Sequence, residues 1–460
     1  MSQKPQTNRM GTEPINKLML SMGIPMILSM MMQALYNIVD SAFVSNMKGS
    51  GELALNALTL AFPVQMLMVA IGIGTGVGTN ALMSKSLGQG NPEKASKVAG
   101  NAEFLGIIIT IVFMVFGIFL VPAYVRSQSA NAEIVDMAIS YLRICCIISI
   151  GIVFFSIFEK ILQSTGLSTY STIAQISGAL VNIILDPILI YGLLGFPELK
   201  VIGAALATVI GQIASFIIAL FFHLRKNKEI SNGLSYMKPS MGIMRGIYSI
   251  GLPAIIAQAL MSIMTYGLNL ILVRVDEAAV TAYGLYYKIQ QFLLFAAFGL
   301  RDAITPIVSF NHGMGQRSRI QEGIKYGLLY TCIVMLAGTI LLEVFAGPFS
   351  AIFGLSGSTQ SLCISAMRVI SISMVFAGAN VAFQGVFQAL DAGLPSLIVS
   401  FCRQTLFVLP VAYAFSLIAR NDTSKTWLIW TTFIIAEILS LLISIFFMKR
   451  ISKDKIDILD

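Results

Sequence analysis

Apolar runs of twenty or more residues recur along the whole chain and are separated by short polar segments. Each run is long enough to cross the ~30 Å hydrocarbon core of a bilayer as a helix. The pattern predicts twelve spans, at 18–44, 53–82, 101–123, 135–164, 170–192, 201–224, 246–273, 278–309, 323–345, 359–390, 396–418 and 426–448. We therefore expect an all-α integral membrane protein with twelve transmembrane helices.

Composition agrees with this reading. Of the 460 residues, 56% are hydrophobic and only 11% are charged, and the mean hydropathy is +0.82. Soluble domains of this size do not have such a composition. The polar residues 1–17 are followed by an apolar run that is too long for a signal peptide, so we expect it to remain as the first span.

The net charge of +8 could suggest a nucleic-acid partner, but the placement of the charges indicates membrane topology instead. The N-terminus, the C-terminus and the segments 83–100, 225–245 and 310–322 carry seventeen Lys and Arg residues. The alternate loops carry six. Basic loops stay in the cytoplasm, so we expect both termini to be cytoplasmic and no nucleic acid to bind.

The chain is duplicated, because identical residues recur at one offset. Pairs 225 residues apart are Ala57 and Ala282, Leu60 and Leu285, Gln65 and Gln290, Ser84 and Ser309, Gly88 and Gly313, Gly90 and Gly315, Arg143 and Arg368, and Gln163 and Gln388. Six spans per half predict two lobes, 1–224 and 246–460, joined by a cytoplasmic linker at 225–245. An even number of spans per half predicts a pseudo-two-fold axis along the membrane normal.

Two acids of the first half have no counterpart in the second. Gly23-Ile24-Pro25 and Gly251-Leu252-Pro253 open spans 1 and 7, and at this offset Asp40 falls on Leu268. Aligning Pro187 with Pro410 puts Asp186 opposite Leu409. A carboxyl group in lipid is costly and usually functional, so the pair predicts a cation or proton site in the first half.

Polar neighbours extend this candidate site. Asn182 and Asp186 are four residues apart and share a helix face, and Pro187 should kink the helix and free backbone carbonyls. Tyr36 and Asn37 lie on the face of Asp40. Two carboxyls, an amide and hydroxyls suit a proton or a hard cation such as sodium. The alternative is that Asp40 merely sits at the outer headgroup level.

The cysteines, histidines, glycines and remaining intramembrane charges do not predict a further functional site. Five cysteines and two histidines offer no disulfide frame or histidine-based metal centre. Gly72, Gly74, Gly76 and Gly78 form Gly-xxx-Gly pairs that favour close helix packing over a phosphate loop. The adjacent Glu159 and Lys160, and the repeat mates Arg143 and Arg368, are expected to snorkel or to form structural pairs. Lys288 could line a cavity, whereas Glu437 has no obvious partner.

The ordered motifs of the chain resemble those of the MATE family, the multidrug and toxic compound extrusion transporters. They are the two Gly-x-Pro openings, Asn37-Ile-Val-Asp40, Ser86-Leu-Gly-Gln-Gly-Asn91, Leu162-Gln-Ser-Thr-Gly166, Asn182-Ile-Ile-Leu-Asp186-Pro187 and Gly203-Ala-Ala-Leu-Ala-Thr208. Each is weak alone, but their order and spacing together are specific. The opening Gly11-Thr-Glu-Pro-Ile-Asn-Lys17 looks most like the bacterial MepA-like group.

The resemblance implies a cation-coupling site in the first lobe. In the family's DinF-like pattern the matching residues are Asp40, Asn182, Asp186 and Thr208, which would hold a proton or Na⁺, with Tyr36 and Tyr141 bordering them. The NorM-like pattern has an acid inside span 7, and this chain has none between Pro253 and Val273. We therefore expect substrate contacts but no coupling ion in the second lobe.

The resemblance further implies a multidrug efflux antiporter of the bacterial inner membrane, of the kind that confers antibiotic resistance. It would export organic, cationic amphiphiles in exchange for protons or sodium by alternating access, as a monomer with no cofactor besides the ion. The 24 methionines fit an adaptable cavity. The alternative is a flippase for a lipid-linked precursor, which would need a cationic cavity built from Lys288, Arg143 and Arg368. An intramembrane enzyme is disfavoured, because the spans show no nucleophile–base set.

Overall fold

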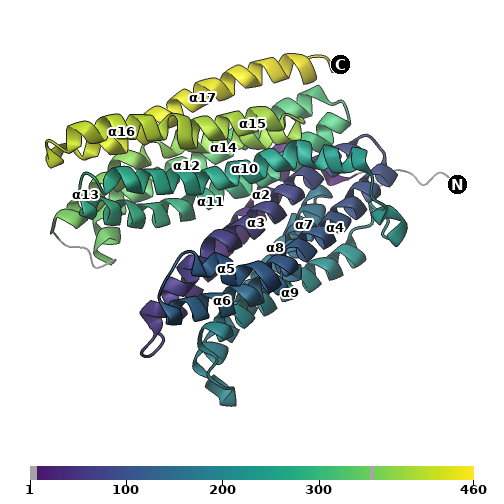
Figure 1. The fold of residues 1–460 in the computed structure, drawn as a ribbon. Helices are drawn as coiled ribbons and strands as arrows, with labels where there is room; N and C mark the ends of the chain where they lie inside the picture. The colour runs from purple at the N-terminus through teal and green to yellow at the C-terminus, as the bar shows by residue number, and fades with distance from the viewer. Residues whose placement is uncertain (1–7, 353–356, 460) are drawn as a thin grey trace. The chain divides into compact units, whose positions relative to one another are not determined.

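The computed structural model describes residues 8–352 and 357–459, and these contain helices and loops but no β-strand (Figure 1). The α-helices are α1 Arg9–Thr12, α2 Ile15–Ser45, α3 Gly51–Gly88, α4 Pro92–Val115, α5 Val121–Arg126, α6 Ala132–Ile147, α7 Ile150–Ser164, α8 Ser168–Tyr191, α9 Lys200–Lys226, α10 Met241–Leu272, α11 Glu277–Gly313, α12 Arg317–Ile352, α13 Gly357–Ser371, α14 Met374–Ala389, α15 Gly393–Phe401, α16 Val408–Ala419 and α17 Trp427–Lys455. Two π-helical turns, η1 Phe116–Leu120 and η4 Cys402–Leu406, interrupt longer helices. Three short 3₁₀ turns are η2 Leu193–Gly195, η3 Leu234–Met237 and η5 Thr423–Lys425.

The helices account for the twelve predicted spans. Ten of them within the described residues are long and apolar enough to cross a membrane, and two bent pairs bring the number to twelve. The bent pairs are α6 with α7, at 45°, and α13 with α14, at 51°. They are the fourth span of each half, so the bend itself is repeated. Neither break contains a proline, and we did not predict the bends.

Two compact units divide the chain. Unit 1 combines Asn8 with Leu28–Leu252, and unit 2 combines Arg9–Ile27 with the residues from Pro253 onward. The predicted lobes 1–224 and 246–460 stay a prediction, and the units follow them except at two helix starts. The first turns of α2 belong to unit 2, and the first turns of α10 belong to unit 1. Both exchanges occur beside a proline inside the helix, Pro25 or Pro253, where a backbone hydrogen bond is missing.

Glycines set the spacing of helices in unit 1. A Cβ at Gly78 would lie 2.0 Å from the carbonyl oxygen of Ile247, and one at Gly76 would lie 2.6 Å from Cγ of Lys160. The two glycines therefore let α3 pack closely against α10 and α7. This packing agrees with the interpretation of the Gly-xxx-Gly pairs as contact surfaces.

The same device brings α8 and α9 together. A Cβ at Gly178 would lie 1.8 Å from Oγ of Ser215 and 2.4 Å from the carbonyl oxygen of Gly211, while one at Gly203 would lie 2.4 Å from that of Leu189. No side chain could fit between these backbones. The contact places the polar residues of α8 directly against those of α9.

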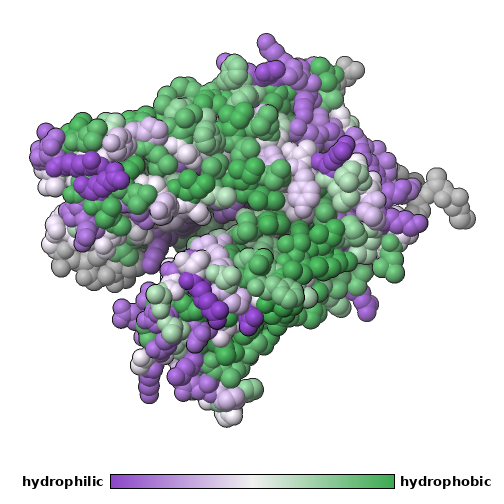
Figure 2. Space-filling view, viewed as in Figure 1, coloured by the Kyte–Doolittle hydropathy of each residue, from purple (hydrophilic) through white to green (hydrophobic). Residues whose placement is uncertain are grey.

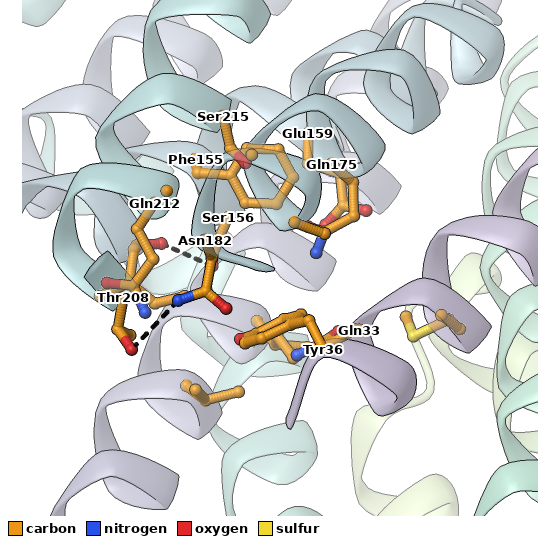
Figure 3. A pocket seen from close by; sticks show the side chains of 17 residues that line it. Gln33, Tyr36, Phe155, Ser156, Glu159, Gln175, Asn182, Thr208, Gln212 and Ser215 are labelled. Carbon is orange, nitrogen blue, oxygen red and sulfur yellow. Dashed lines mark hydrogen bonds between the residues drawn. The ribbon is translucent and has the colours of Figure 1, made fainter. Parts of the chain in front are cut away.

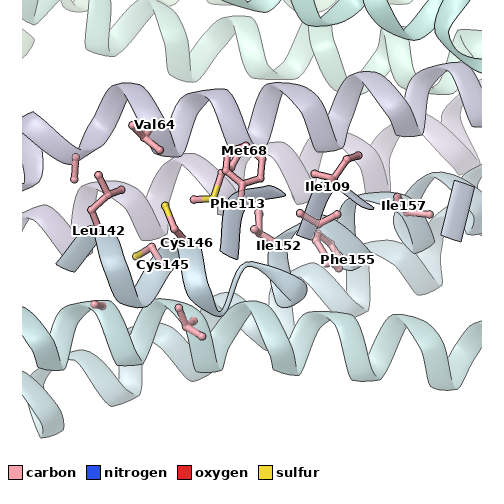
Figure 4. Packing of buried hydrophobic residues seen from close by; sticks show 14 of the residues in the cluster. Val64, Met68, Ile109, Phe113, Leu142, Cys145, Cys146, Ile152, Phe155 and Ile157 are labelled. Atoms are coloured by element: carbon pink, nitrogen blue, oxygen red, sulfur yellow. The ribbon is translucent and has the colours of Figure 1, made fainter. Parts of the chain in front are cut away.

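Apolar side chains form both the interior and much of the surface. In unit 1 the core includes Met68, Phe113, Cys146, Ile152 and Phe155, from α3, α4, α6 and α7 (Figure 4). Large apolar side chains are also exposed, for example Phe119 at 70% and Val344 at 64%. Hydrophobic residues cover helix surfaces and hydrophilic ones gather toward helix ends (Figure 2). Exposed apolar area on this scale is what a surrounding bilayer accommodates.

Gly178→Ala tests the α8–α9 contact. The added methyl meets a backbone carbonyl that cannot move aside, and overpacking of this kind costs about 1–3 kcal/mol. We expect the melting temperature of the purified protein to fall by roughly 1–3 °C. Gly284→Ala is the matched control, because nothing lies within 4 Å of its Cβ position in α11. Equal stability of the two variants would contradict the close contact.

Candidate functional site

Helix α8 carries two of the predicted site residues on one buried face. Asn182 is 2% exposed and Asp186 is fully buried. Nδ2 of Asn182 lies 3.5 Å from Oδ1 of Asp186. The same atom lies 3.5 Å from Oγ1 of Thr208, which projects from α9 (Figure 3). The helix continues past Pro187 to Tyr191, and the proline leaves the carbonyl four residues earlier without its helical donor.

Asp40 joins this group from α2. Its side chain is buried, and its carboxyl group interacts electrostatically with that of Asp186. It also interacts with the hydroxyl groups of Tyr36 and Tyr141. The structure therefore brings the two acids that lack a repeat mate, Asp40 and Asp186, together inside unit 1. Asp40 is therefore enclosed by protein rather than exposed on the surface of α2.

Gln65 on α3 belongs to the same polar group and was not predicted from the sequence. Its Nε2 donates to the hydroxyl of Tyr141 at 3.1 Å and lies 3.7 Å from Sγ of Cys145. Tyr141 in turn interacts with the side chain of Thr208. A signal was present, because Gln65 is an amide within an apolar span and has the repeat mate Gln290.

Three acceptor oxygens in this group lack a donor. They are Oδ1 of Asp40, Oδ1 of Asn182 and Oδ2 of Asp186, all buried. Buried polar atoms are almost always paired, because an unmet acceptor costs free energy. A proton or a cation would meet this need. Carboxylate, amide and hydroxyl oxygens are the ligands that hard cations prefer, so the four residues Asp40, Asn182, Asp186 and Thr208 fit Na⁺ as well as H⁺.

A small pocket of about 40 Å³ lies beside these residues in unit 1. Asn182, Thr208 and Tyr36 line it, whereas Asp40 and Asp186 do not. Gln33, Glu159, Gln175, Gln212 and Ser215 supply further polar groups from α2, α7, α8 and α9 (Figure 3). A water needs roughly 10–15 Å³ of such volume, so a few waters or a partly hydrated ion would fit.

Two predicted cavity residues lie apart from this pocket. Asn37 is exposed on α2, whereas Asp40 is buried. Asn37 does not line the pocket, whereas Tyr36 does. Lys288 is exposed on α11 in unit 2. The buried site in unit 1 therefore contains Tyr36 and Tyr141 but neither of these two.

Two other sets of intramembrane charges are paired. Lys160 is 1% exposed and does not snorkel; its Nζ donates to Gln163, which donates to Glu159. Glu437, for which the sequence suggested no partner, accepts from Arg403 at 2.7 Å. The sequence pattern did not identify this partner, because it lies 34 residues earlier on another helix.

Comparison with known proteins identifies the family. The MatE family model matches residues 25–188 and again residues 253–414. The two matches begin at the prolines of spans 1 and 7, and they confirm the duplication. Multidrug export protein MepA of Staphylococcus saprophyticus is 24% identical over 445 residues, which are 96% of each chain.

Solved structures agree. An outward-facing multidrug resistance MATE family transporter of the MOP superfamily has a TM-score of 0.90 and 26% identity, covering 98% of this chain and 100% of that one. A MOP superfamily transporter from Pyrococcus furiosus has a TM-score of 0.89 and 26% identity, with 98% and 99% covered. The fold class predicted from the sequence is confirmed, and with both halves matching one family model, this chain belongs to the MatE family of multidrug export transporters.

Proposed function

We propose that this protein is an antiporter that exports organic, cationic amphiphiles in exchange for protons or Na⁺ by alternating access. One observation carries the proposal: the three buried oxygens of Asp40, Asn182 and Asp186 without donors. A multidrug exporter that draws on an ion gradient needs a site whose occupancy changes during the cycle. This group of oxygens is the best candidate within the described residues.

The exchange of a proton or Na⁺ follows from the close placement of two carboxyl groups, those of Asp40 and Asp186. When the site is empty and ionised, the Asp40 and Asp186 carboxylates repel each other. A proton or Na⁺ removes that repulsion and supplies a partner to the unmet oxygens. The two occupancies therefore favour different arrangements of α2 relative to α8, and an ion can drive a conformational change only through such a difference.

The pocket supplies a route to this site. Asn182 and Thr208 belong both to the ion ligands and to the pocket wall, so an ion or a proton-carrying water in the pocket reaches them directly. Tyr36 lies on the α2 side of the pocket and interacts with Asp40. Movement of α2 would consequently change the pocket and the carboxyl group together.

We place the protein in a bacterial cell membrane as a monomer, with both termini in the cytoplasm. The distribution of Lys and Arg supports the orientation, and the MepA relatives of staphylococci support the source and the substrate class. The flippase alternative is less well supported. Arg143 is exposed and donates to the carbonyl oxygen of Ile118 at 3.2 Å, and the best-formed polar site contains acids.

The decisive experiment is drug efflux from proteoliposomes under separately imposed proton and sodium gradients. Export driven by one gradient and collapsed by dissipating it identifies the coupling ion. Export that responds to neither gradient would contradict the antiport proposal.

Asp40→Asn should abolish gradient-driven export, because an amide can neither bind a proton in exchange nor attract Na⁺ with a full charge. We expect at least about a tenfold loss of transport rate, the effect of roughly 1.4 kcal/mol. Membrane levels should stay normal, as measured by immunoblot. Normal efflux by a well-expressed variant would remove Asp40 from the site.

Neutralising acids of unit 2 should change stability or drug preference more than ion dependence. Glu343 accepts a hydrogen bond from Ser371 and Asp302 pairs with Arg301, so both have structural partners. We expect Asp302→Asn, Glu343→Gln and Asp391→Asn to keep their response to the imposed gradients after normalisation for expression. A variant that loses the gradient response but keeps drug affinity would show that the coupling site extends into unit 2.

A further inference from the structure

Unit 2 contains a buried ion pair between Arg403, in η4, and Glu437, on α17. Nη2 of Arg403 lies 2.7 Å from Oε1 of Glu437, and Nε lies 3.1 Å from both carboxylate oxygens. The two side chains are 7% and 10% exposed. Buried charges persist only when they are paired and hydrogen-bonded. The geometry here is two-pronged, as in the strongest guanidinium–carboxylate pairs.

Further groups hold the carboxylate in place. Nδ2 of Asn380, on α14, donates to Oε2 of Glu437 at 2.8 Å and to the Glu437 carbonyl at 3.0 Å. Ser444 donates to Oδ1 of Asn380 at 2.8 Å and thereby fixes the orientation of the amide. Glu437 therefore sits in a prepared cradle, in which Arg403 is the cation.

Two buried hydroxyl groups near Glu437 have no hydrogen-bond partner. The hydroxyl of Tyr286 is buried without a partner and interacts electrostatically with Glu437. Oγ of Ser440, one helical turn along α17 from Glu437, is also buried and unpaired. These are hard oxygen donors of the type that bind small cations.

Arg403 lies in a π-helical turn between α15 and α16. Residues Cys402–Leu406 form η4, while the corresponding helix of the first half, α8, is α-helical from Ser168 to Tyr191. Cys402, Arg403 and Gln404 are buried in succession. Such turns are frequent at functional sites. The π turn is therefore a difference between the halves at the position of the cation.

The repeat shows what occupies this position in unit 1. The pairs Phe221-Phe222 and Phe446-Phe447 align at 225 residues and put Glu437 opposite Gln212. The offset of Gln163 and Gln388 puts Asn380 opposite Phe155. Aligning Gly166-Leu167 with Gly393-Leu394 gives an offset of 227 residues, and aligning Pro187 with Pro410 gives an offset of 223. Arg403 lies between these two anchors and therefore falls opposite one of residues 176–180.

The positions opposite Glu437 and Asn380 line the pocket of unit 1, and so do two of the five residues opposite Arg403. Phe155, Gln212 and the pair Gly178-Ala179 are among the residues that line it. Unit 2 has a guanidinium group and its carboxylate at repeat positions whose counterparts in unit 1 line a pocket. The same region of the repeat therefore contains a buried ion pair in unit 2 and borders a pocket in unit 1.

We propose that Glu437, positioned by Asn380, forms with Tyr286 and Ser440 a latent cation site in unit 2, whose resident ligand is the guanidinium group of Arg403. A guanidinium stays charged throughout the physiological pH range, so unit 2 keeps its cation in every state without drawing on the solution. Removing the arginine should expose a site for a free guanidinium ion or another monovalent cation. In terms of the proposed function, this explains why ion exchange would be confined to unit 1.

The test is a thermal-shift titration of purified full-length Arg403→Ala, with millimolar guanidinium chloride and with sodium chloride at equal ionic strength. We expect the substitution to lower the melting temperature by roughly 3–5 °C, as for one partner of a buried pair. Guanidinium should restore about half or more of this loss, more than sodium does. The readout needs no transport, so its outcome is independent of the role of Asp40.

Matched controls separate a cation site from general stabilisation. The double variant Arg403→Ala/Glu437→Ala keeps the cavity but lacks the carboxylate, and it should not respond to guanidinium. Arg317→Ala removes an exposed arginine paired with Asp457 and should show neither loss nor rescue. If Arg403→Ala does not accumulate, Arg403→Gln replaces it, and Arg403→Lys should be stable without added ion. Equal responses of single and double variants, or no response by either Ala or Gln, would overturn the proposal.

Discussion

The close contact between α8 and α9 is the constraint on which the site in unit 1 depends. Asn182, on α8, can reach Thr208, on α9, only because the two backbones approach at Gly178 and Gly211. With larger residues at these positions, the amide of Asn182 and the hydroxyl of Thr208 would separate. The pocket wall, which draws residues from both helices, would change as well. Small residues at a helix contact thus determine the chemistry of polar residues one turn away.

The two units solve one problem in different ways. Each has a carboxylate in its interior, where an isolated charge is costly. Unit 2 pairs Glu437 with a cation of its own, in a fixed geometry. Unit 1 instead holds Asp40 beside a second acid and leaves three oxygens unmet. The first arrangement is stable in one form, and the second depends on what is bound. A duplicated fold can therefore carry one fixed and one responsive half.

Much of this could be predicted from the sequence, because membranes impose strong patterns. Span lengths follow from bilayer thickness, and the i,i+4 spacing of Asn182 and Asp186 fixed their common face. The repeat offset identified Asp40 as an acid without a mate. Contacts between distant helices could not be predicted in the same way. Arg403, the partner of Glu437, lies in a π-helical turn that the local sequence pattern does not predict. The contact of Gln65 with Tyr141 depends on where α6 lies relative to α3. The bends of the fourth span in each half have no proline to mark them.

The exchange of helix starts between the units has a consequence for biogenesis. Residues Arg9–Ile27 leave the ribosome first, yet they pack within unit 2, where Arg319 and Asn311 donate to the carbonyl oxygen of Met10. At about 5–20 residues per second, Pro253 is synthesised roughly 10 to 45 seconds later. During that delay Leu18, Met19 and Met22, fully buried in the finished protein, have no final partners. The first span must therefore be inserted long before its N-terminal turns, up to Ile27, can pack in unit 2. Lipid or the insertion machinery must shield these turns until then.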